Sequence, residues 1–182
     1  QGSVSRDYTQ PESAALIGDG ATVEWDPRLT QAVDLEAELA IVIGRSARRV
    51  SQDHVLGFVL GYTCVNDVTA PEPLFANHEF HQWCRAKSLP VFGPIGPYIG
   101  SGIDPTGLRV RGIVDGKPKQ DYPVSDMIFS PQDIVWHISR EIALYPGDLI
   151  ACGTSVGAAD LADGQTIVVE IPGVGSLSNQ LG

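Results

Sequence analysis

The stretch that decides the fold covers residues 33–44 and reads Val33-Asp34-Leu35-Glu36-Ala37-Glu38-Leu39-Ala40-Ile41-Val42-Ile43-Gly44. Its first half alternates apolar with acidic residues, and its second half is apolar. Successive side chains of a strand point to opposite faces, so the alternation predicts a β-strand with two unlike faces. Because the strand ends in apolar residues, its acidic face is not uniformly exposed to water.

The segments around this strand are short and rich in turn residues. The 20 glycines and 13 prolines are spread along the chain, which is typical of β structure. Ser51 is expected to cap a short helical turn. Further strands are expected at residues 57–66, Leu108–Val114, Leu149–Cys152, Thr166–Ile171 and Ser176–Asn179, with a tight turn at Asp115-Gly116.

The clearest helix begins after Ser130, a favourable N-cap that Pro131 follows, and we expect Pro146-Gly147 to end it. The chain lacks the regular βαβ alternation of a doubly wound fold. The predicted class is therefore a β-rich α+β domain. We expect residues 1–12 to form an N-terminal arm and residues 13–182 to form one catalytic domain.

The charge balance excludes several kinds of partner. Among 182 residues, 12 are basic and 22 acidic, giving a formal charge of −10. Nucleic acids and anionic membranes both need a basic face, so neither is an expected partner. The longest uncharged apolar stretch, Val55 to Val65, is too short to span a bilayer, and no leader segment is recognised. The cytoplasm is the expected location.

Three carboxylates are candidates for a metal site. Glu36 and Glu38 are two positions apart on the predicted strand, so their side chains share one face. Asp67 follows a long apolar run. With no matching set of His or Cys ligands, these residues favour a hard cation, Mg²⁺ or Mn²⁺, over zinc. The alternatives are a solvated strand face for the glutamates and a turn cap for Asp67.

Two further positions could contact a small anionic ligand. Lys87 belongs to a basic pair with Arg85 in an otherwise acidic chain, although a surface lysine is the more common meaning. Thr154 lies in a glycine-flanked loop whose backbone amides could reach an anion, although such loops are also plain turns. Cys84 and Cys152 have no evident activating base, so a thiol nucleophile is not expected.

Several motifs occur together in the order of one known family. They are residues 33–44, Gly61-Tyr62-Thr63-Cys64-Val65-Asn66-Asp67-Val68-Thr69, Gln82-Trp83, Arg85-Ala86-Lys87-Ser88, Ser125-Asp126-Met127-Ile128-Phe129, Pro146-Gly147-Asp148, Gly153-Thr154 and Gly173-Val174-Gly175-Ser176-Leu177-Ser178-Asn179. From about Ser13 onward the chain resembles the fumarylacetoacetate hydrolase family. The resemblance implies a mixed β-sandwich roll, a homodimer, and a divalent cation held by Glu36, Glu38 and Asp67. The expected cation is Mg²⁺ or Mn²⁺, with Ca²⁺ as an alternative.

The resemblance also implies a reaction class. Family members act on 2-oxo acids and their enols by C–C hydrolysis, decarboxylation or isomerisation, and a metal-bound enolate is common to these reactions. Lys87 matches the lysine that contacts the substrate's oxyanion or carboxylate, and Thr154 matches a carboxylate-binding threonine. Gln82 falls near a substrate-contacting position, and Arg85 would add local positive charge.

The chain departs from the family pattern in two places. Ala70-Pro71-Glu72 stands where relatives often carry Ala-Arg-Asp, and no histidine precedes His54, although the family's hydrolases use a lid His and Glu upstream. One alternative is therefore a non-catalytic paralogue that binds metal and 2-oxo acid but lacks the lid pair. A second alternative is a structural dimer module whose acidic strand is merely solvated.

Overall fold

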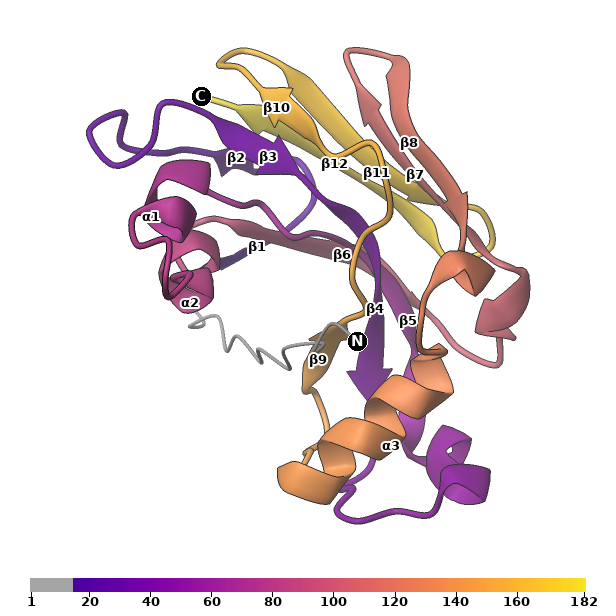
Figure 1. Cartoon of the computed structure of the whole chain (residues 1–182). Helices are drawn as coiled ribbons and strands as arrows, with labels where there is room; N and C mark the ends of the chain where they lie inside the picture. The colour runs from indigo at the N-terminus through magenta and orange to yellow at the C-terminus, as the bar shows by residue number, and fades with distance from the viewer. Residues whose placement is uncertain (1–14) are drawn as a thin grey trace.

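The computed structural model describes residues 15–182, so the arm predicted at residues 1–12 lies outside the described residues. Two five-stranded sheets form the body of the molecule (Figure 1). The first sheet has the order β1 (Leu16–Ile17), β6 (Gly93–Gly100), β5 (Val59–Asn66), β4 (Ala37–Ile43) and β9 (Leu149–Ala151). The second has the order β2 (Thr22–Val23), β12 (Gly175–Leu181), β11 (Thr166–Ile171), β7 (Arg109–Val114) and β8 (Lys117–Pro123). A separate ladder pairs β10 (Ala159–Leu161) with β3 (Val33–Leu35).

The two sheets pack against each other around one apolar core. Leu39, Ile41 and Cys64 of the first sheet join Ile171 and Leu177 of the second in a single buried cluster. β1 pairs parallel to β6, and β2 pairs parallel to β12, whereas the remaining ladders are antiparallel. This arrangement confirms the predicted β-rich α+β class and the mixed β-sandwich.

The strand quoted first is interrupted between its acidic residues. β3 ends at Leu35 and β4 begins at Ala37, so Glu36 lies at the junction of two strands that pair with different partners. All seven residues of β4 are buried. Residue Ala37 is in register with Asn66 of β5, which brings Asp67, the residue after β5, to Glu36. The backbone N–H of Asp67 donates to the Glu36 carbonyl oxygen at 3.0 Å.

The helices lie at two ends of the sheets. α1 (Pro71–Phe75) and α2 (Trp83–Lys87) lie together on one side, and α3 (Pro131–Glu141) packs with the 3₁₀ helix η2 (Gln52–Phe58) at the lower end of Figure 1. Two short 3₁₀ turns, η3 (Pro105–Gly107) and η4 (Val124–Asp126), flank β7 and β8. No helix in residues 15–182 has the length and apolar character needed to cross a membrane.

Two local expectations need correction. α3 ends at Glu141 and not at Pro146-Gly147, because the backbone of Leu144 pairs with Ala47 and draws the chain out of the helix. Ser51 precedes η2 but makes no side-chain cap, since its hydroxyl is hydrogen-bonded to the His54 Nδ1 at 2.8 Å. The N-cap at Ser130 is confirmed, with reciprocal bonds between Ser130 and Asp133.

Candidate metal and substrate site

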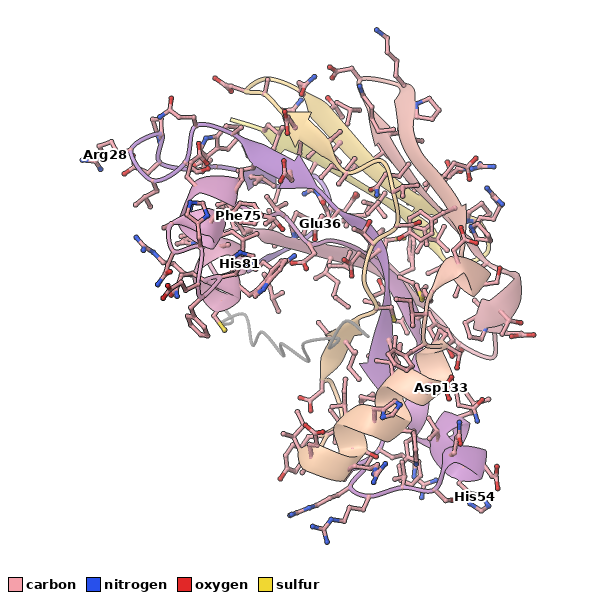
Figure 2. All side chains as sticks on the ribbon, viewed as in Figure 1. Arg28, Glu36, His54, Phe75, His81 and Asp133 are labelled. Carbon is pink, nitrogen blue, oxygen red and sulfur yellow. The ribbon has the colours of Figure 1, made fainter. Side chains whose placement is uncertain are left out.

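Three carboxylate groups meet where β3, β4 and β5 adjoin. One oxygen from each of Glu36, Glu38 and Asp67 lies within 4.8 Å of the other two. The Glu38 residue is 2% exposed, whereas the Glu36 and Asp67 side chains are 19% and 25% exposed. The cluster is therefore closed on the Glu38 side and open on the other. Glu36 lies near the middle of the molecule in Figure 2, far from His54 and Asp133 at the α3 end.

Lys87 bridges two of these carboxylates from the end of α2. Its ammonium nitrogen lies 2.7 Å from Glu36 Oε2 and 2.5 Å from Asp67 Oδ2, and it donates to Thr69 Oγ1 at 2.9 Å. Its side chain is 9% exposed, and the Trp83 ring lies 5.7 Å away. Three contacts and an aromatic wall hold the ammonium at the open side of the cluster.

The charges perturb one another. Burial raises the pKa of Glu38 well above its usual value, and the Asp67 carboxylate adds to the rise, whereas Lys87 opposes it. Burial by itself would lower the pKa of Lys87, but the Asp67 and Glu36 carboxylates outweigh burial and raise it. Three carboxylates and one ammonium leave a formal charge of −2 when all are ionised, which one divalent cation would neutralise.

The residues fit a divalent cation. Oxygens bound at about 2.1 Å in an octahedron lie about 3.0 Å apart when adjacent and about 4.2 Å apart when opposite. The three oxygens lie within 4.8 Å of one another, close enough for carboxylate side chains to converge on one ion. Carboxylate oxygens are the donors that Mg²⁺ and Mn²⁺ prefer.

The glycine-flanked loop after β9 approaches the same cluster from the other side. The backbone N–H of Gly153 donates to Glu38 Oε2 at 2.8 Å. Gly153 has φ +92°, in the left-handed region that favours glycine, so the loop can present this N–H to the carboxylate. The Thr154 hydroxyl donates to the Ala37 carbonyl oxygen at 3.0 Å, which places Thr154 beside the residue between the two glutamates.

Two other candidate residues lie outside this network. Gln82 precedes α2, and its side-chain amide donates to the Phe80 carbonyl at 3.2 Å. Arg85 is exposed on α2, and no hydrogen bond or ion pair joins its side chain to the described residues. The His81 ring stacks edge-on against Phe75 at 5.1 Å and does not join the carboxylate cluster.

Sequence reasoning missed three residues that contact the site: Thr69, Gln120 and Tyr122. Thr69 accepts from Lys87. Gln120 and Tyr122 come from β8 and bind the backbone of Ala37, which is over 80 positions away along the chain. The position of Thr69, two residues after Asp67, was the one available signal. A strand pairing across the sandwich leaves no local pattern for the other two.

Comparison with known proteins identifies the family. The model of the fumarylacetoacetate (FAA) hydrolase C-terminal domain matches residues 6–182. The chain belongs to the fumarylacetoacetate hydrolase family. The resemblance inferred from the motifs is thus confirmed.

Individual members of the fumarylacetoacetate hydrolase family match over most of the chain. The oxaloacetate tautomerase YisK of Bacillus subtilis is 37% identical over 92% of this chain and 58% of its own length. The structure of a 2-hydroxyhepta-2,4-diene-1,7-dioate isomerase from Mycobacterium marinum has a TM-score of 0.89 and 37% identity, with coverage of 94% of this chain and 66% of that one.

A third member of the family was solved with a metal. It is a fumarylpyruvate hydrolase from Pseudomonas aeruginosa in complex with Mn²⁺ and pyruvate, with 25% identity, a TM-score of 0.87, and coverage of 92% of this chain and 76% of that one. Similar proteins of this family are therefore enzymes.

This chain spans about two thirds of the length of the isomerase structure.

Proposed function

We propose that this family member is a divalent-metal-dependent enzyme acting on a 2-oxo acid or its enol. The observation that carries the proposal is the carboxylate cluster of Glu36, Glu38 and Asp67 with Lys87 bound against it. Hard oxygen ligands suit Mg²⁺ or Mn²⁺ as the cofactor, with Ca²⁺ as an alternative. The Mn²⁺ in the similar fumarylpyruvate hydrolase supports this assignment.

The proposed substrate is a small anionic 2-oxo acid. When bound, the cation would draw electron density from the keto oxygen of the substrate and so favour its enol form. Lys87 would place an ammonium near the oxygen on which negative charge develops. Thr154 would receive the substrate carboxylate, and Gln82 and Arg85 would contact or attract the rest of the molecule. In a chain of charge −10, this local positive charge is what captures an anion.

Isomerisation is the first reaction to test, because the proteins named above as a tautomerase and an isomerase are both 37% identical to this chain. C–C hydrolysis is the second candidate, favoured by the named hydrolase with pyruvate bound. Hydrolysis makes an extra demand, since a base must activate water beside the substrate. Decarboxylation would use the same cation and the same lysine.

The test combines metal binding with turnover. Calorimetry should detect Mn²⁺ binding, and ketonisation of enol-oxaloacetate should proceed faster with Mn²⁺ than in chelator. Glu38→Gln removes the negative charge of one ligand while keeping an oxygen acceptor for Gly153, and we expect it to weaken Mn²⁺ binding at least tenfold and to abolish turnover. The matched control Glu170→Gln, on β11, alters a carboxylate that pairs with Arg111 and should change neither.

The outcomes separate the competing functions. Turnover of acylpyruvates with release of pyruvate would identify hydrolysis, and release of CO₂ would identify decarboxylation. Mn²⁺ and pyruvate binding with no turnover of any 2-oxo acid would support the non-catalytic paralogue. Absence of any Mn²⁺-dependent rise in Tm would contradict a metal site, because a ligand that binds the native state must raise Tm. In that case the supported alternative would be the structural dimer module whose acidic strand is solvated.

We also propose that the chain forms a homodimer. Large apolar side chains stay exposed in the single chain, among them Tyr98 at 67%, Ile128 at 85% and Val156 at 88%. Burial of such groups between two copies would remove apolar surface from water. Light scattering during gel filtration should give twice the chain mass, and a monomer across the micromolar range would contradict the dimer.

A further inference from the structure

The backbone between the two glutamates is held by side chains from elsewhere in the fold. The Ala37 N–H donates to Gln120 Oε1 at 2.9 Å. The Ala37 carbonyl oxygen accepts from the Tyr122 hydroxyl at 2.5 Å and from the Thr154 hydroxyl at 3.0 Å. Ala37 has Glu36 on one side and Glu38 on the other, so any shift of its peptide groups moves both carboxylates.

Gln120 also holds the loop that carries Thr154. Its amide nitrogen donates to Thr154 Oγ1 at 2.8 Å and to the Ser155 carbonyl oxygen at 3.1 Å. A glutamine amide has two N–H donors, and both are used here while its oxygen accepts from Ala37. The residue is 1% exposed, so water cannot replace these bonds at low cost.

We propose that Gln120 is a positioning residue that fixes the two glutamates and the Thr154 hydroxyl relative to each other. It thereby supports the affinity for the divalent cation and the affinity for the substrate carboxylate at the same time. This inference rests on the proposed function of the site. Gln120 touches neither ligand itself, and acts through Ala37 on one side and through Thr154 on the other.

The hydrogen-bond pattern explains how Thr154 can serve a substrate without breaking the network. A threonine hydroxyl has one proton and can rotate. If that proton turns from Ala37 to a substrate carboxylate, the Ala37 carbonyl keeps the Tyr122 hydroxyl as its donor. The Gln120 N–H meanwhile keeps Thr154 Oγ1 in place. Tyr122 is therefore a second positioning residue, because it holds the Ala37 carbonyl when the Thr154 proton turns to the substrate.

The test uses Gln120→Met, which keeps the length of the side chain and removes its hydrogen bonds. The control is Gln165→Met, because Gln165 also bonds a backbone N–H and a side-chain oxygen, those of Ala162 and Asp115, away from the site. Mn²⁺ is titrated into the metal-free chain of 182 residues, and pyruvate is then titrated into the Mn²⁺-loaded protein. Both titrations are run well below the Tm of each variant.

We expect Gln120→Met to weaken Mn²⁺ binding about tenfold, in line with other residues that orient metal ligands, and to weaken pyruvate binding as well. Gln165→Met should match the wild type in both. Thr154→Val should weaken pyruvate binding but not Mn²⁺ binding. In the variant that carries both Gln120→Met and Thr154→Val, the loss of pyruvate-binding free energy should be smaller than the sum of the two single losses. Both substitutions disable the same hydroxyl.

Tyr122→Phe provides a milder second variant that loses a single oxygen atom. The Ala37 carbonyl would then retain only the Thr154 proton, so pyruvate should bind several-fold more weakly while Mn²⁺ affinity changes little. This comparison remains informative if Gln120→Met fails to fold.

A purely structural role for Gln120 would lower Tm and leave both affinities unchanged, which would overturn the inference. The inference would also be overturned if the losses of pyruvate-binding free energy in Gln120→Met and Thr154→Val simply added in the double variant. Failure of the wild type to bind Mn²⁺ would overturn the proposed function itself, so the two failures are distinguishable.

Discussion

The ion pairs of Lys87 and those of Arg109 and Arg111 belong to different surroundings. Lys87 is 9% exposed and contacts Glu36 and Asp67 between β3, β5 and α2. Arg109 and Arg111 on β7 pair with Asp121 on β8 and Glu170 on β11, and these four side chains are 37% to 46% exposed. Lys87 and Glu36 are 51 positions apart and Arg111 and Glu170 are 59 apart, whereas Arg109 and Asp121 belong to one β-hairpin.

This difference in exposure determines how much each set of ion pairs contributes to stability and whether it can bind a cation. Water screens the exposed pairs, so each contributes at most about 1 kcal/mol to stability. The Lys87 cluster is poorly screened and carries excess negative charge, which is unfavourable for the metal-free fold but suited to binding a cation. The same three carboxylates should thus lower stability without metal and create affinity for it.

Loss of the buried ammonium should have the largest effect. Lys87→Met leaves Glu36 and Asp67 facing Glu38 without a cation, and we expect the metal-free protein to lose about 3 kcal/mol of unfolding free energy. Urea denaturation in chelator measures this loss. Mn²⁺ should raise the Tm of Lys87→Met more than that of the wild type, because the ion replaces the missing charge. If Arg111→Met lost as much unfolding free energy as Lys87→Met, the buried and exposed ion pairs would not differ in the way described.

Neutralising the most buried carboxylate should change stability in the opposite direction. The pKa of Glu38 in the fold is raised, so its stabilising contribution is present below the unfolded value of 4.5 and is lost as pH rises through the folded value. Glu38→Gln stays neutral at every pH. We expect the metal-free variant to be about 1 kcal/mol more stable than the wild type at about pH 8, and to lose this advantage below about pH 4. Thermal unfolding of both proteins in chelator across that pH range shows whether the variant is more or less stable than the wild type.

A like-charge pair near the site should give a smaller pH effect. Asp34 faces Asp160 across the β3–β10 ladder, and burial together with Asp160 raises the pKa of Asp34 from 3.8 to about 6. Its contribution to stability is therefore complete below 3.8 and is lost as pH rises through about 6. Asp160→Asn removes the repulsion, so the variant should become more stable than the wild type as pH rises from about 4, by about 1 kcal/mol above about pH 7 after allowance for solvent screening. Parallel urea titrations measure this difference, and the absence of a gain would show that burial, without Asp160, raises the pKa of Asp34.

The smallest effect is expected for the exposed pairs. Arg111→Met should cost about 0.5 kcal/mol at low salt, and the cost should vanish at about 1 M NaCl, where the Debye length is about 3 Å. The Lys87→Met penalty should persist at that salt concentration because its partners are partly buried. A salt-insensitive Arg111 penalty would mean that packing and not charge is lost.

Regular alternation made some elements predictable. The strand over Thr166–Ile171 agrees with the expected range, because its side chains alternate between the core and the surface. The start of α3 was also predictable, since its cap consists of neighbours in sequence. β6 and α2 were not predicted: Pro94 and Pro97 interrupt the pattern of β6, and α2 has only five residues.

The sequence alone determined which residues are available for chemistry: the acidic pair Glu36 and Glu38, the following Asp67, and the basic Lys87. Motif order also sufficed to indicate the family. Only the tertiary structure decided that Lys87 bridges Glu36 and Asp67, and that Gln120 and Tyr122 hold Ala37 between the glutamates. The physical reason is that periodicity reports which face a side chain takes, whereas hydrogen bonds between distant strands depend on how the two sheets pack.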